Sequence, residues 1–329
     1  MKKILHVVNN ISKTSIPHLW VTKHEQNVVQ MDITPLSKIS IKMFKEFDII
    51  HLHHLKSAFL ISFINLLFCV PTLFTVHGSY RQLSRINKLL FYIVIFSCKR
   101  IVFVNSTLFI ELPTFAKSII KNKYLFINNA VDLSDCSKYK TVDVKRKYNF
   151  TLADKMIFHP ARFVKEKNHT LILYSFKKLL IKNPNVKLIL AGDGELKAEI
   201  IKLINALSLT DKVLLTGTIS KDEVFSFLKE SDLFIMPSIS EGLNVAFLEA
   251  LSFNQKILVS EIPSFSSFAE ENMSNISNFN IVFSNPYSIE SMTKGMDVAL
   301  SQIKNMDLNL DFMSITKMFK QYEIIYSGI

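Results

Sequence analysis

Short runs rich in β-branched residues alternate along this chain with longer amphipathic segments, a pattern typical of a parallel sheet covered by helices. The pattern occurs twice, before and after a polar, basic stretch at about residues 134–150. The strands predicted before that stretch are Ile4–Val8, Asn27–Met31, Asp48–Leu52, Thr72–Val76, Arg100–Val104 and Tyr124–Ile127. Those predicted after it are Met156–Pro160, Lys187–Ala191, Val213–Thr216, Leu233–Pro237, Ile257–Ser260 and Asn280–Phe283.

The repeated pattern predicts an α/β protein made of two doubly wound parallel-sheet domains. A chain of 329 residues is long enough for two domains, each with its own core. We place the first domain at residues 1–150 and the second at 151–311, followed by an amphipathic terminal helix at about 312–329. Because such domains bind ligands at the carboxyl ends of their strands, we expect the site in a cleft between them.

Charge is distributed unevenly between the two halves. Residues 1–150 carry 21 Lys and Arg against 8 Asp and Glu, whereas the remaining residues carry 18 against 20. Since Phe, Leu and Ile accompany the positive charge, an anionic membrane surface is a better partner for the first half than nucleic acid. The three cysteines have no C-x-x-C spacing, which favours reduced thiols in the cytosol.

Two apolar segments of the first half bear on membrane contact. Ser57–Val76 approaches the ~20 residues that span a bilayer, but Asn65 and Pro71 interrupt it. We therefore predict a buried helix at about 57–69 and a strand at 72–76. In the segment 81–100, three cations share one helical stripe ahead of an apolar run. It is either a helix in a membrane interface or a core helix with a solvated basic face.

A group of cations follows the predicted strand Met156–Pro160. Arg162 and Lys167 come directly after it, and a helix is predicted at about Thr170–Leu180. A guanidinium, an ammonium and the amides of a helix N-terminus together suit a diphosphate. After the next strand, the turn Gly192-Asp193-Gly194 lets a ligand or another stretch of backbone approach closely.

Two glutamates stand eight residues apart after the predicted strand Leu233–Pro237. Glu241 precedes Gly242, a helix is predicted from about Asn244, and Glu249 lies one to two turns into it. A carboxylate at that position can accept two hydrogen bonds from the hydroxyls of a ribose.

Histidines gather at the end of another predicted strand, in His51-Leu52-His53-His54. His51 and His53 share one face of that strand. A zinc site is one interpretation, and strand-end histidines in the predicted cleft are the other. No obvious Cys or carboxylate partner follows, which favours the second.

Several short motifs follow one another along the chain. They are Asp48-Ile49-Ile50-His51, Thr75-Val76-His77-Gly78, Asn129-Ala130-Val131-Asp132, Ala161-Arg162 to Lys167-Asn168, Gly192-Asp193-Gly194, Thr216-Gly217, and Glu241 with Glu249. In this order and spacing they resemble family 4 retaining glycosyltransferases of the GT-B fold, of the bacterial surface-polysaccharide (O-antigen or capsule) type. The resemblance runs from about residue 48 to the end. It implies two Rossmann-like domains facing a central cleft, with the last helix crossing back onto the first domain.

The resemblance also implies residue roles. Catalytic roles fall to His77, Arg162, Lys167 and Glu241, and donor-binding roles to Gly242, Leu243, Asn244, Val245 and Glu249. The two cations would neutralise the leaving nucleotide diphosphate, and Glu249 would hold the ribose. No cofactor and no metal are implied, because the cations and a helix N-terminus take the metal's role. A UDP-sugar is favoured over a GDP-sugar as the donor.

The implied function is transfer of a sugar from a nucleotide-sugar to a lipid-linked or glycan acceptor, with retention, in surface polysaccharide biosynthesis. The enzyme would be cytoplasmic and peripheral on the inner face of the cytoplasmic membrane. One alternative is a catalytically silent GT-B protein that binds nucleotide, because Val8-Asn9-Asn10-Ile11-Ser12-Lys13 has no glycine where the family has a Gly-Gly loop. The other alternative is a sugar-nucleotide epimerase.

Overall fold

A computed structural model describes residues 2–8, 29–272, 280–303 and 310–329. The chain divides into two compact units. Unit 1 comprises residues 1–130 together with 313–329, and unit 2 comprises residues 131–312. The segment Asn9–Lys13, where a Gly-Gly loop is missing, lies outside the described residues.

Unit 1 contains a six-stranded parallel sheet of order β2-β1-β3-β4-β5-β6. Its strands are β1 (Lys2–Val8), β2 (Val29–Pro35), β3 (Ile49–Leu52), β4 (Thr72–Val76), β5 (Arg100–Phe103) and β6 (Tyr124–Phe126). Its helices are α2 (Met43–Glu46), α3 (Leu55–Asn65), α4 (Arg85–Ser97), α5 (Ser106–Ile110), α6 (Thr114–Ile120) and α16 (Ile315–Ser327), with short 3-10 turns between some of them.

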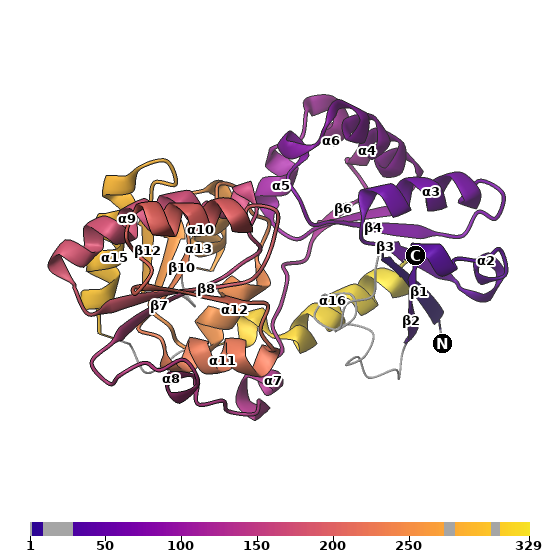
Figure 1. The fold of residues 1–329 in the computed structure, drawn as a ribbon. Coiled ribbons are helices and arrows are strands. Elements are labelled where there is room, and N and C mark those ends of the chain that lie inside the picture. The colour runs from indigo at the N-terminus through magenta and orange to yellow at the C-terminus, as the bar shows by residue number, and fades with distance from the viewer. Residues whose placement is uncertain (1, 9–28, 273–279, 304–309) are drawn as a thin grey trace. The chain divides into compact units, whose positions relative to one another are not determined.

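The two faces of this sheet are covered by different helices (Figure 1). Because successive side chains of a strand point to opposite faces, Leu5 packs with the helices α3 and α4, whereas Ile4 packs with α16. The last helix, α16, buries Tyr322 and Tyr326 against the sheet. The amine of Lys2 donates to the carbonyl of Tyr326 (2.9 Å), which joins the first strand to the last helix.

Unit 2 contains a second six-stranded parallel sheet, of order β12-β11-β10-β7-β8-β9. Its strands are β7 (Lys155–Pro160), β8 (Val186–Ala191), β9 (Val213–Gly217), β10 (Leu233–Met236), β11 (Ile257–Ser260) and β12 (Ile281–Ser284). Its helices are α7 (Leu133–Lys138), α8 (Val144–Lys147), α9 (His169–Lys182), α10 (Lys197–Ala206), α11 (Lys221–Glu230), α12 (Val245–Ser252), α13 (Pro263–Glu271) and α15 (Ile289–Ser301).

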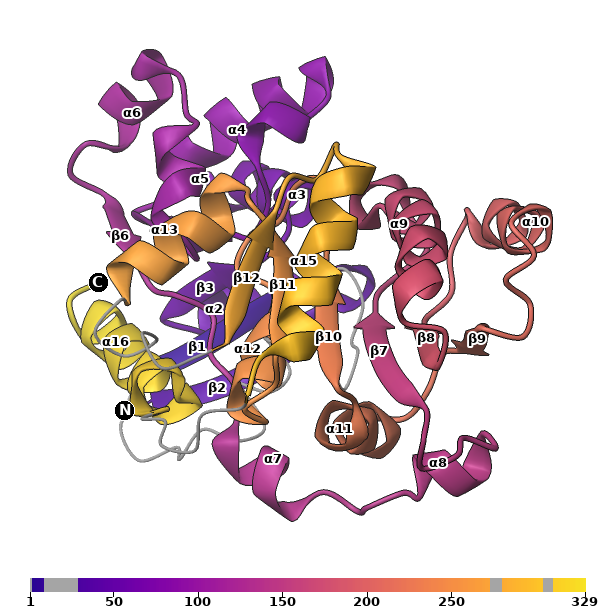
Figure 2. The same cartoon turned by 90° about the vertical axis from the view of Figure 1, so that its left-hand side faces the viewer.

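Figure 2 shows this second sheet with α15 lying in front of it. The helices α9, α10 and α15 cover one face and pack on Ile157, Leu188 and Leu258. On the other face, Phe158 of β7 stacks on Phe227 of α11, with ring centroids 5.0 Å apart. The predicted α/β class and all twelve predicted strands are confirmed. The second strand, predicted at Asn27–Met31, is found at Val29–Pro35, and Asn27 and Val28 lie outside the described residues.

The boundary between the two units lies after Ala130 and not at residue 150. The sequence places residues 131–150 in the first domain and predicts a polar linker at about 134–150, but this stretch contains α7 and α8 and packs within unit 2. Val144 is fully buried, and the amine of Lys147 and the hydroxyl of Tyr148 both donate to Glu223 of α11 (2.5 and 3.0 Å).

The apolar segment Ser57–Val76 forms a helix followed by a strand, as predicted, but the prediction that this helix is buried and runs to about residue 69 is wrong. α3 ends at Asn65, and Leu60 and Phe63 on its outer side are 44% and 67% exposed. The side chain of Asn65 ends α3, since it donates to the carbonyl of Val70 (2.6 Å) and accepts from the Val70 amide (3.0 Å). Cys69 lies between them in the left-handed region with φ 55°. Among the described residues, none of the helices combines the length and apolar character needed to cross a membrane.

Candidate functional site

The two loops that carry the predicted site follow neighbouring strands of unit 2. β7 and β10 pair in parallel, with Leu233 opposite Ile157. Because both strands end at the same edge of the sheet, their loops emerge side by side. The amide of Ile239 donates to the carbonyl of Glu166 (2.9 Å), which joins the two loops.

Lys167 and Glu241 form an ion pair at this junction, and their side chains are only 13% and 11% exposed. The carboxylate of Glu241 also accepts from the Ser238 hydroxyl (2.7 Å) and from the Asn244 amide (3.2 Å). The sequence predicted that both residues take part in one site, and the structure brings them into contact. Three side chains therefore hold the Glu241 carboxylate in place, which is the preorganisation that binding of a polar ligand requires.

Asn168 connects this junction to a third loop. It adopts a left-handed conformation with φ 57°, which asparagine tolerates better than most residues. Its side-chain amide donates to the carbonyls of Pro237 (3.2 Å) and Pro286 (2.8 Å). The 14-residue helix α9 begins at the next residue, slightly earlier than predicted.

Arg162 lies in the first residues after β7, and its side chain is exposed. The glycines that follow β8 pack against this segment of backbone. A Cβ on Gly192, whose φ is +150°, would lie 2.1 Å from the carbonyl oxygen of Ala161, and one on Gly194 would lie 2.5 Å from that of Phe163. The close approach predicted for this turn is thus to the chain's own backbone, and the turn fixes the segment that carries Arg162.

The residues Gly242 to Val245 lead into α12. Leu243 is 2% exposed, so its side chain anchors the loop in the core of unit 2. Asn244 caps the helix, and its side-chain oxygen accepts from the Ala246 amide (2.9 Å). The amides of this first turn carry the positive end of the helix dipole, which favours an anion.

Glu249 lies on α12 and is 4% exposed. It forms an ion pair with Lys221, the first residue of α11. The ammonium of Lys221 also lies 4.8 Å from the centre of the Phe225 ring. The family resemblance assigns Glu249 to a ribose, and no sequence motif indicates Lys221 as its partner.

His77 lies in unit 1, just after β4, and its ring is partly buried. Its Nε2 is 3.3 Å from Nδ1 of His53. Burial lowers the pKa of His77 to about 4, with a smaller contribution from the charge of His54. His77 is therefore a neutral imidazole near pH 7, with one N–H donor and one acceptor nitrogen.

The histidines His51 and His53 are buried and share one face of the sheet, as predicted, whereas His54 is exposed. His6 of β1 joins them, and the three offer nitrogens within 4.8 Å of one another, a spacing that could hold a metal ion. These nitrogens make hydrogen bonds within unit 1, including one of 2.9 Å between Nδ1 of His6 and Nε2 of His53. Burial lowers the pKa of His51 and of His53 well below the usual value.

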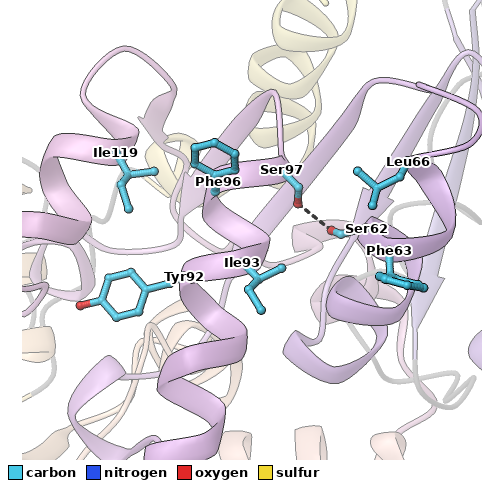
Figure 3. Close-up of a pocket in the computed structure, with 8 residues that line it drawn as sticks. All are labelled: Ser62, Phe63, Leu66, Tyr92, Ile93, Phe96, Ser97 and Ile119. Atoms are coloured by element: carbon cyan, nitrogen blue, oxygen red, sulfur yellow. Dashed lines mark hydrogen bonds between the residues drawn. The ribbon is translucent and has the colours of Figure 1, made fainter.

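An apolar groove lies between α3 and α4 in unit 1, with a volume of about 370 Å³. Its lining residues are Ser62, Phe63, Leu66, Tyr92, Ile93, Phe96, Ser97 and Ile119, drawn in Figure 3. The Ser97 hydroxyl donates to the Ser62 hydroxyl across the groove (2.8 Å). Phe63 and Phe96 are 67% and 73% exposed, so the rim is strongly apolar.

The sequence of α4 leaves two alternatives open, a helix in a membrane interface and a core helix with a solvated basic face. The structure shows features of both. α4 is a core helix, because Phe91 and Val94 are buried. Its outer side is not simply a solvated basic face, since Ile86 and Leu89 are 72% and 63% exposed. Arg85, at its start, is exposed beside these apolar side chains.

Five residues of these clusters are not predicted from the sequence. They are His6, Ser238, Lys221, Tyr322 and Tyr326. The i, i+4 spacing of the two tyrosines places them on one face of the last helix, which is the one signal that pointed to a shared environment.

Comparisons with known proteins agree with this architecture. The solved structure of HepE from Anabaena in complex with UDP and glucose superimposes with a TM-score of 0.76, covering 100% of both chains at 14% identity. At that identity the likeness is one of fold. The fold is GT-B, as the sequence motifs predicted.

Two curated relatives match part of the chain. The N-acetylgalactosamine-N,N'-diacetylbacillosaminyl-diphospho-undecaprenol 4-alpha-N-acetylgalactosaminyltransferase of Campylobacter jejuni is 30% identical over 135 residues, which is 41% of this chain and 34% of that protein. The O-antigen biosynthesis glycosyltransferase WclY of Escherichia coli is 30% identical over 154 residues, 47% of this chain and 40% of that protein. Each alignment thus spans less than half of the relative's length.

The family comparison covers the unit that holds Arg162, Lys167, Glu241 and Glu249. Residues 142–309, just over half of the chain, match the family model described as glycosyl transferases group 1. The chain therefore belongs to the group 1 family of glycosyl transferases.

Proposed function

We propose that the protein transfers a sugar from a nucleotide-sugar donor to a lipid-linked or glycan acceptor. The observation that carries this proposal is the ion pair between Lys167 and Glu241, which joins the loops after two neighbouring parallel strands. This edge of a doubly wound sheet is where such folds bind nucleotides. A cation and a carboxylate meet there, and a charged diphosphate attached to a polar sugar requires both kinds of group.

The diphosphate leaving group would be neutralised by Arg162, by Lys167 and by the first amides of α12. An ammonium has three N–H donors, so Lys167 can keep its bond to Glu241 and still bind a phosphate oxygen. Arg162 is exposed and presents a fork of donors that suits phosphate. We propose that this set acts without a metal cofactor, because it places positive charge where negative charge develops in the transition state.

The remaining roles concern the donor's other groups. Glu249 would accept hydrogen bonds from the ribose, while Glu241 and the amides of Leu243, Asn244 and Val245, after Gly242, would contact the sugar. We propose UDP-sugars as donors, which agrees with the UDP found with HepE. His77 would contact the sugar or the acceptor, and the anomeric configuration would be retained.

The acceptor is proposed to be carried by a lipid at the inner face of the cytoplasmic membrane. The groove between α3 and α4 is apolar and open, and the ammonium of Lys123 lies 5.8 Å from the centre of the Phe96 ring at its rim. Arg81 on η2 (Tyr80–Gln82) and Arg85 at the start of α4 are exposed in the same unit. Apolar side chains flanked by cations suit hydrocarbon chains beneath anionic headgroups. The printed names of the two relatives, which mention a diphospho-undecaprenol and O-antigen biosynthesis, support a surface-polysaccharide acceptor.

The test is to incubate the purified protein with a bacterial lipid extract and a panel of UDP- and GDP-sugars. Nucleotide release and the mass gain of the lipid fraction are measured together. Arg162→Ala is run beside Arg146→Ala, a matched control at an exposed arginine of α8. We expect release with a mass gain of one sugar, lost in Arg162→Ala and kept in Arg146→Ala.

Two other outcomes would contradict the proposal. Nucleotide binding without release or mass gain, across lipid and glycan acceptors, would indicate a silent nucleotide-binding protein. Conversion of the donor to an isomeric sugar with no lengthened glycan would indicate an epimerase.

A further inference from the structure

A chain of hydrogen bonds runs through unit 1 from His77 to the last helix. His77 Nε2 contacts His53 Nδ1 (3.3 Å), and His53 Nε2 contacts His6 Nδ1 (2.9 Å). His6 Nε2 lies 3.5 Å from the hydroxyl of Tyr326, which lies 2.7 Å from Nδ1 of His51. The members His6, His51, His53 and Tyr326 are at most 3% exposed, and they come from β1, from β3 and its end, and from α16.

The chain continues beyond His51. His51 Nε2 lies 2.7 Å from the Thr75 hydroxyl, and this hydroxyl lies 3.2 Å from that of Tyr322. Both Thr75 and Tyr322 are buried as well. Six consecutive contacts therefore link seven side chains.

His51, His53 and His77 are neutral near pH 7, and His6 is fully buried between them, which gives the chain a direction. Burial is the main cause that lowers the pKa of His51, His53 and His77 below the usual value. A neutral imidazole has one nitrogen that donates and one that accepts. Along the printed contacts, a chain of neutral imidazoles in which His77 Nε2 donates to His53 has every later group donating to the next, and a chain in which His77 Nε2 accepts has every contact reversed.

The contact lengths at Tyr326 favour the direction in which His77 Nε2 donates to His53. Its hydroxyl lies 2.7 Å from His51 and 3.5 Å from His6. A phenol is a stronger donor than a threonine hydroxyl, and 2.7 Å is the usual length for an O–H donor, whereas 3.5 Å is at the limit of a hydrogen bond. Tyr326 then donates to His51 and accepts from His6, and the proton of His77 lies on Nε2.

We propose that His6, His53 and Tyr326 are positioning residues that hold His77 as its Nε2–H tautomer. Nδ1 of His77 is then an acceptor for a hydroxyl of the sugar or of the acceptor. The inference rests on the proposed function only in giving His77 a place in transfer. Its structural part, that a hydroxyl on α16 sets the tautomer of a histidine after β4, stands independently of activity.

The test uses the full-length protein labelled with ¹⁵N in histidine, because the nitrogen shifts distinguish the two tautomers. The His77 signals are assigned by their loss in His77→Gln. Tyr326→Phe keeps the ring and removes the hydroxyl that joins His6 to His51. Tyr80→Phe is the matched control, because its hydroxyl bonds to Tyr92 (3.2 Å) in the same unit but outside the chain.

We expect wild-type His77 to be the Nε2–H tautomer, and its nitrogen signals to move in Tyr326→Phe but not in Tyr80→Phe. In the transfer assay, Tyr326→Phe should lower kcat about 2- to 10-fold, the net effect of one hydrogen bond, with little change in KM for the donor. His77 signals identical in Tyr326→Phe and wild type, or a wild-type Nδ1–H tautomer, would overturn the proposal.

A second pair of variants separates positioning from general damage. His53→Asn keeps a polar atom near the place of Nδ1 and should retain much of the activity, whereas His53→Phe removes it and should not. Equal loss in both would contradict a positioning role. If wild type transfers no sugar while the His77 signals still respond to Tyr326→Phe, the proposed function fails and the hydrogen-bond chain stands.

Discussion

Lys167 and Glu241 form an ion pair although 74 residues separate them in the chain. Their side chains are 13% and 11% exposed, so each charge has lost most of its water and depends on the other. Ser238 and Asn244 complete the shell of the carboxylate. Such a pair can serve stability, catalysis or both, and variants separate these roles.

Lys167→Met should lose transfer activity by about a hundred- to a thousandfold, as expected when a charged donor to a leaving group is removed. It should also destabilise unit 2 by about 1–3 kcal/mol, because the largely buried Glu241 carboxylate loses its charged partner and keeps only the hydrogen bonds from Ser238 and Asn244. The double variant Lys167→Met/Glu241→Gln should regain most of that stability but no activity. Steady-state kinetics and urea unfolding measure the two effects.

The control for this pair is Lys178→Met, which removes an ion pair with Glu290 whose side chains are 49% and 83% exposed. It should change neither stability nor kinetics measurably. Near-normal turnover in Lys167→Met would remove Lys167 from the site.

Gly192→Ala should destabilise unit 2 by at least about 1–3 kcal/mol and weaken nucleotide binding. The new Cβ would lie 2.1 Å from the carbonyl oxygen of Ala161, at a backbone φ that side chains rarely adopt. The segment that carries Arg162 must then shift. Thermal unfolding and nucleotide titration measure both effects.

Gly328→Ala is the control, since its Cβ would meet its nearest atom at 3.6 Å. Equal behaviour of the two variants would contradict the packing role of the turn.

The strands could be predicted because buried parallel strands are continuous β-branched runs, a signal that is local in sequence. The helices α7 and α8 could not. They have six and four residues and are mostly polar, and their stability comes from partners such as Glu223 that lie far along the chain. The predicted domain boundary was misplaced for the same reason.

The candidate site was predicted in part, also for a physical reason. Lys167 and Glu241 each follow a strand, so strand order alone brings them to one edge of the sheet. The hydrogen-bond chain of unit 1 depends on the register that sets His6 beside His51 and on a helix that returns Tyr326 to β1 from 320 residues away. Neither pairing leaves a periodic signal in the sequence.

Stability should fall as the pH is lowered from about 6.5 toward 4. Burial, with a smaller contribution from the charge of Lys167, lowers the pKa of His169 to about 4, below the 6.5 of the unfolded state. Between these values the unfolded state binds more protons, so stability that is present above pH 6.5 is lost as the pH falls. For His169 the loss at pH 5 is about 2 kcal/mol. Urea unfolding at pH 8 and pH 5 measures it.

His169→Met tests the origin of this pH dependence. The ring of His169 packs against Phe163, with centroids 4.6 Å apart, and methionine can fill that space without a titratable group. The difference in unfolding free energy between pH 8 and pH 5 should shrink in the variant. An unchanged difference would show that other groups cause the acid sensitivity.

Glu249→Ala should weaken nucleotide binding about 10- to 100-fold, the range for loss of a hydrogen bond to a charged group. Lys221→Met leaves the carboxylate in place and should keep most of the affinity while lowering stability. Calorimetric titration with UDP and thermal unfolding distinguish the two. If both variants lose stability alike and neither loses affinity, Glu249 is a structural partner of Lys221 and not a ribose ligand.

Unit 1 should bind vesicles that contain anionic lipid, and reversing the charges of Arg81, Arg85 and Lys88 should abolish that binding. Arg81 and Arg85 are exposed, and Lys88 lies 5.3 Å from the centre of the Tyr80 ring. Each cation near an anionic surface contributes about 1 kcal/mol, so losing three attractions weakens binding by more than about a hundredfold. Flotation with vesicles measures the Arg81→Glu/Arg85→Glu/Lys88→Glu variant.

A matched control and an apolar variant make this test specific. Lys178→Glu/Lys182→Glu/Lys202→Glu changes the net charge equally on exposed helices of unit 2 and should leave flotation intact. Phe63→Ser/Phe96→Ser removes apolar side chains from the rim of the groove without changing charge, and should weaken binding even at low salt. If the control and the test charge reversals reduce binding equally, binding depends on net charge and not on Arg81, Arg85 and Lys88. Binding that survives the Phe variant would mean that the groove takes no hydrocarbon.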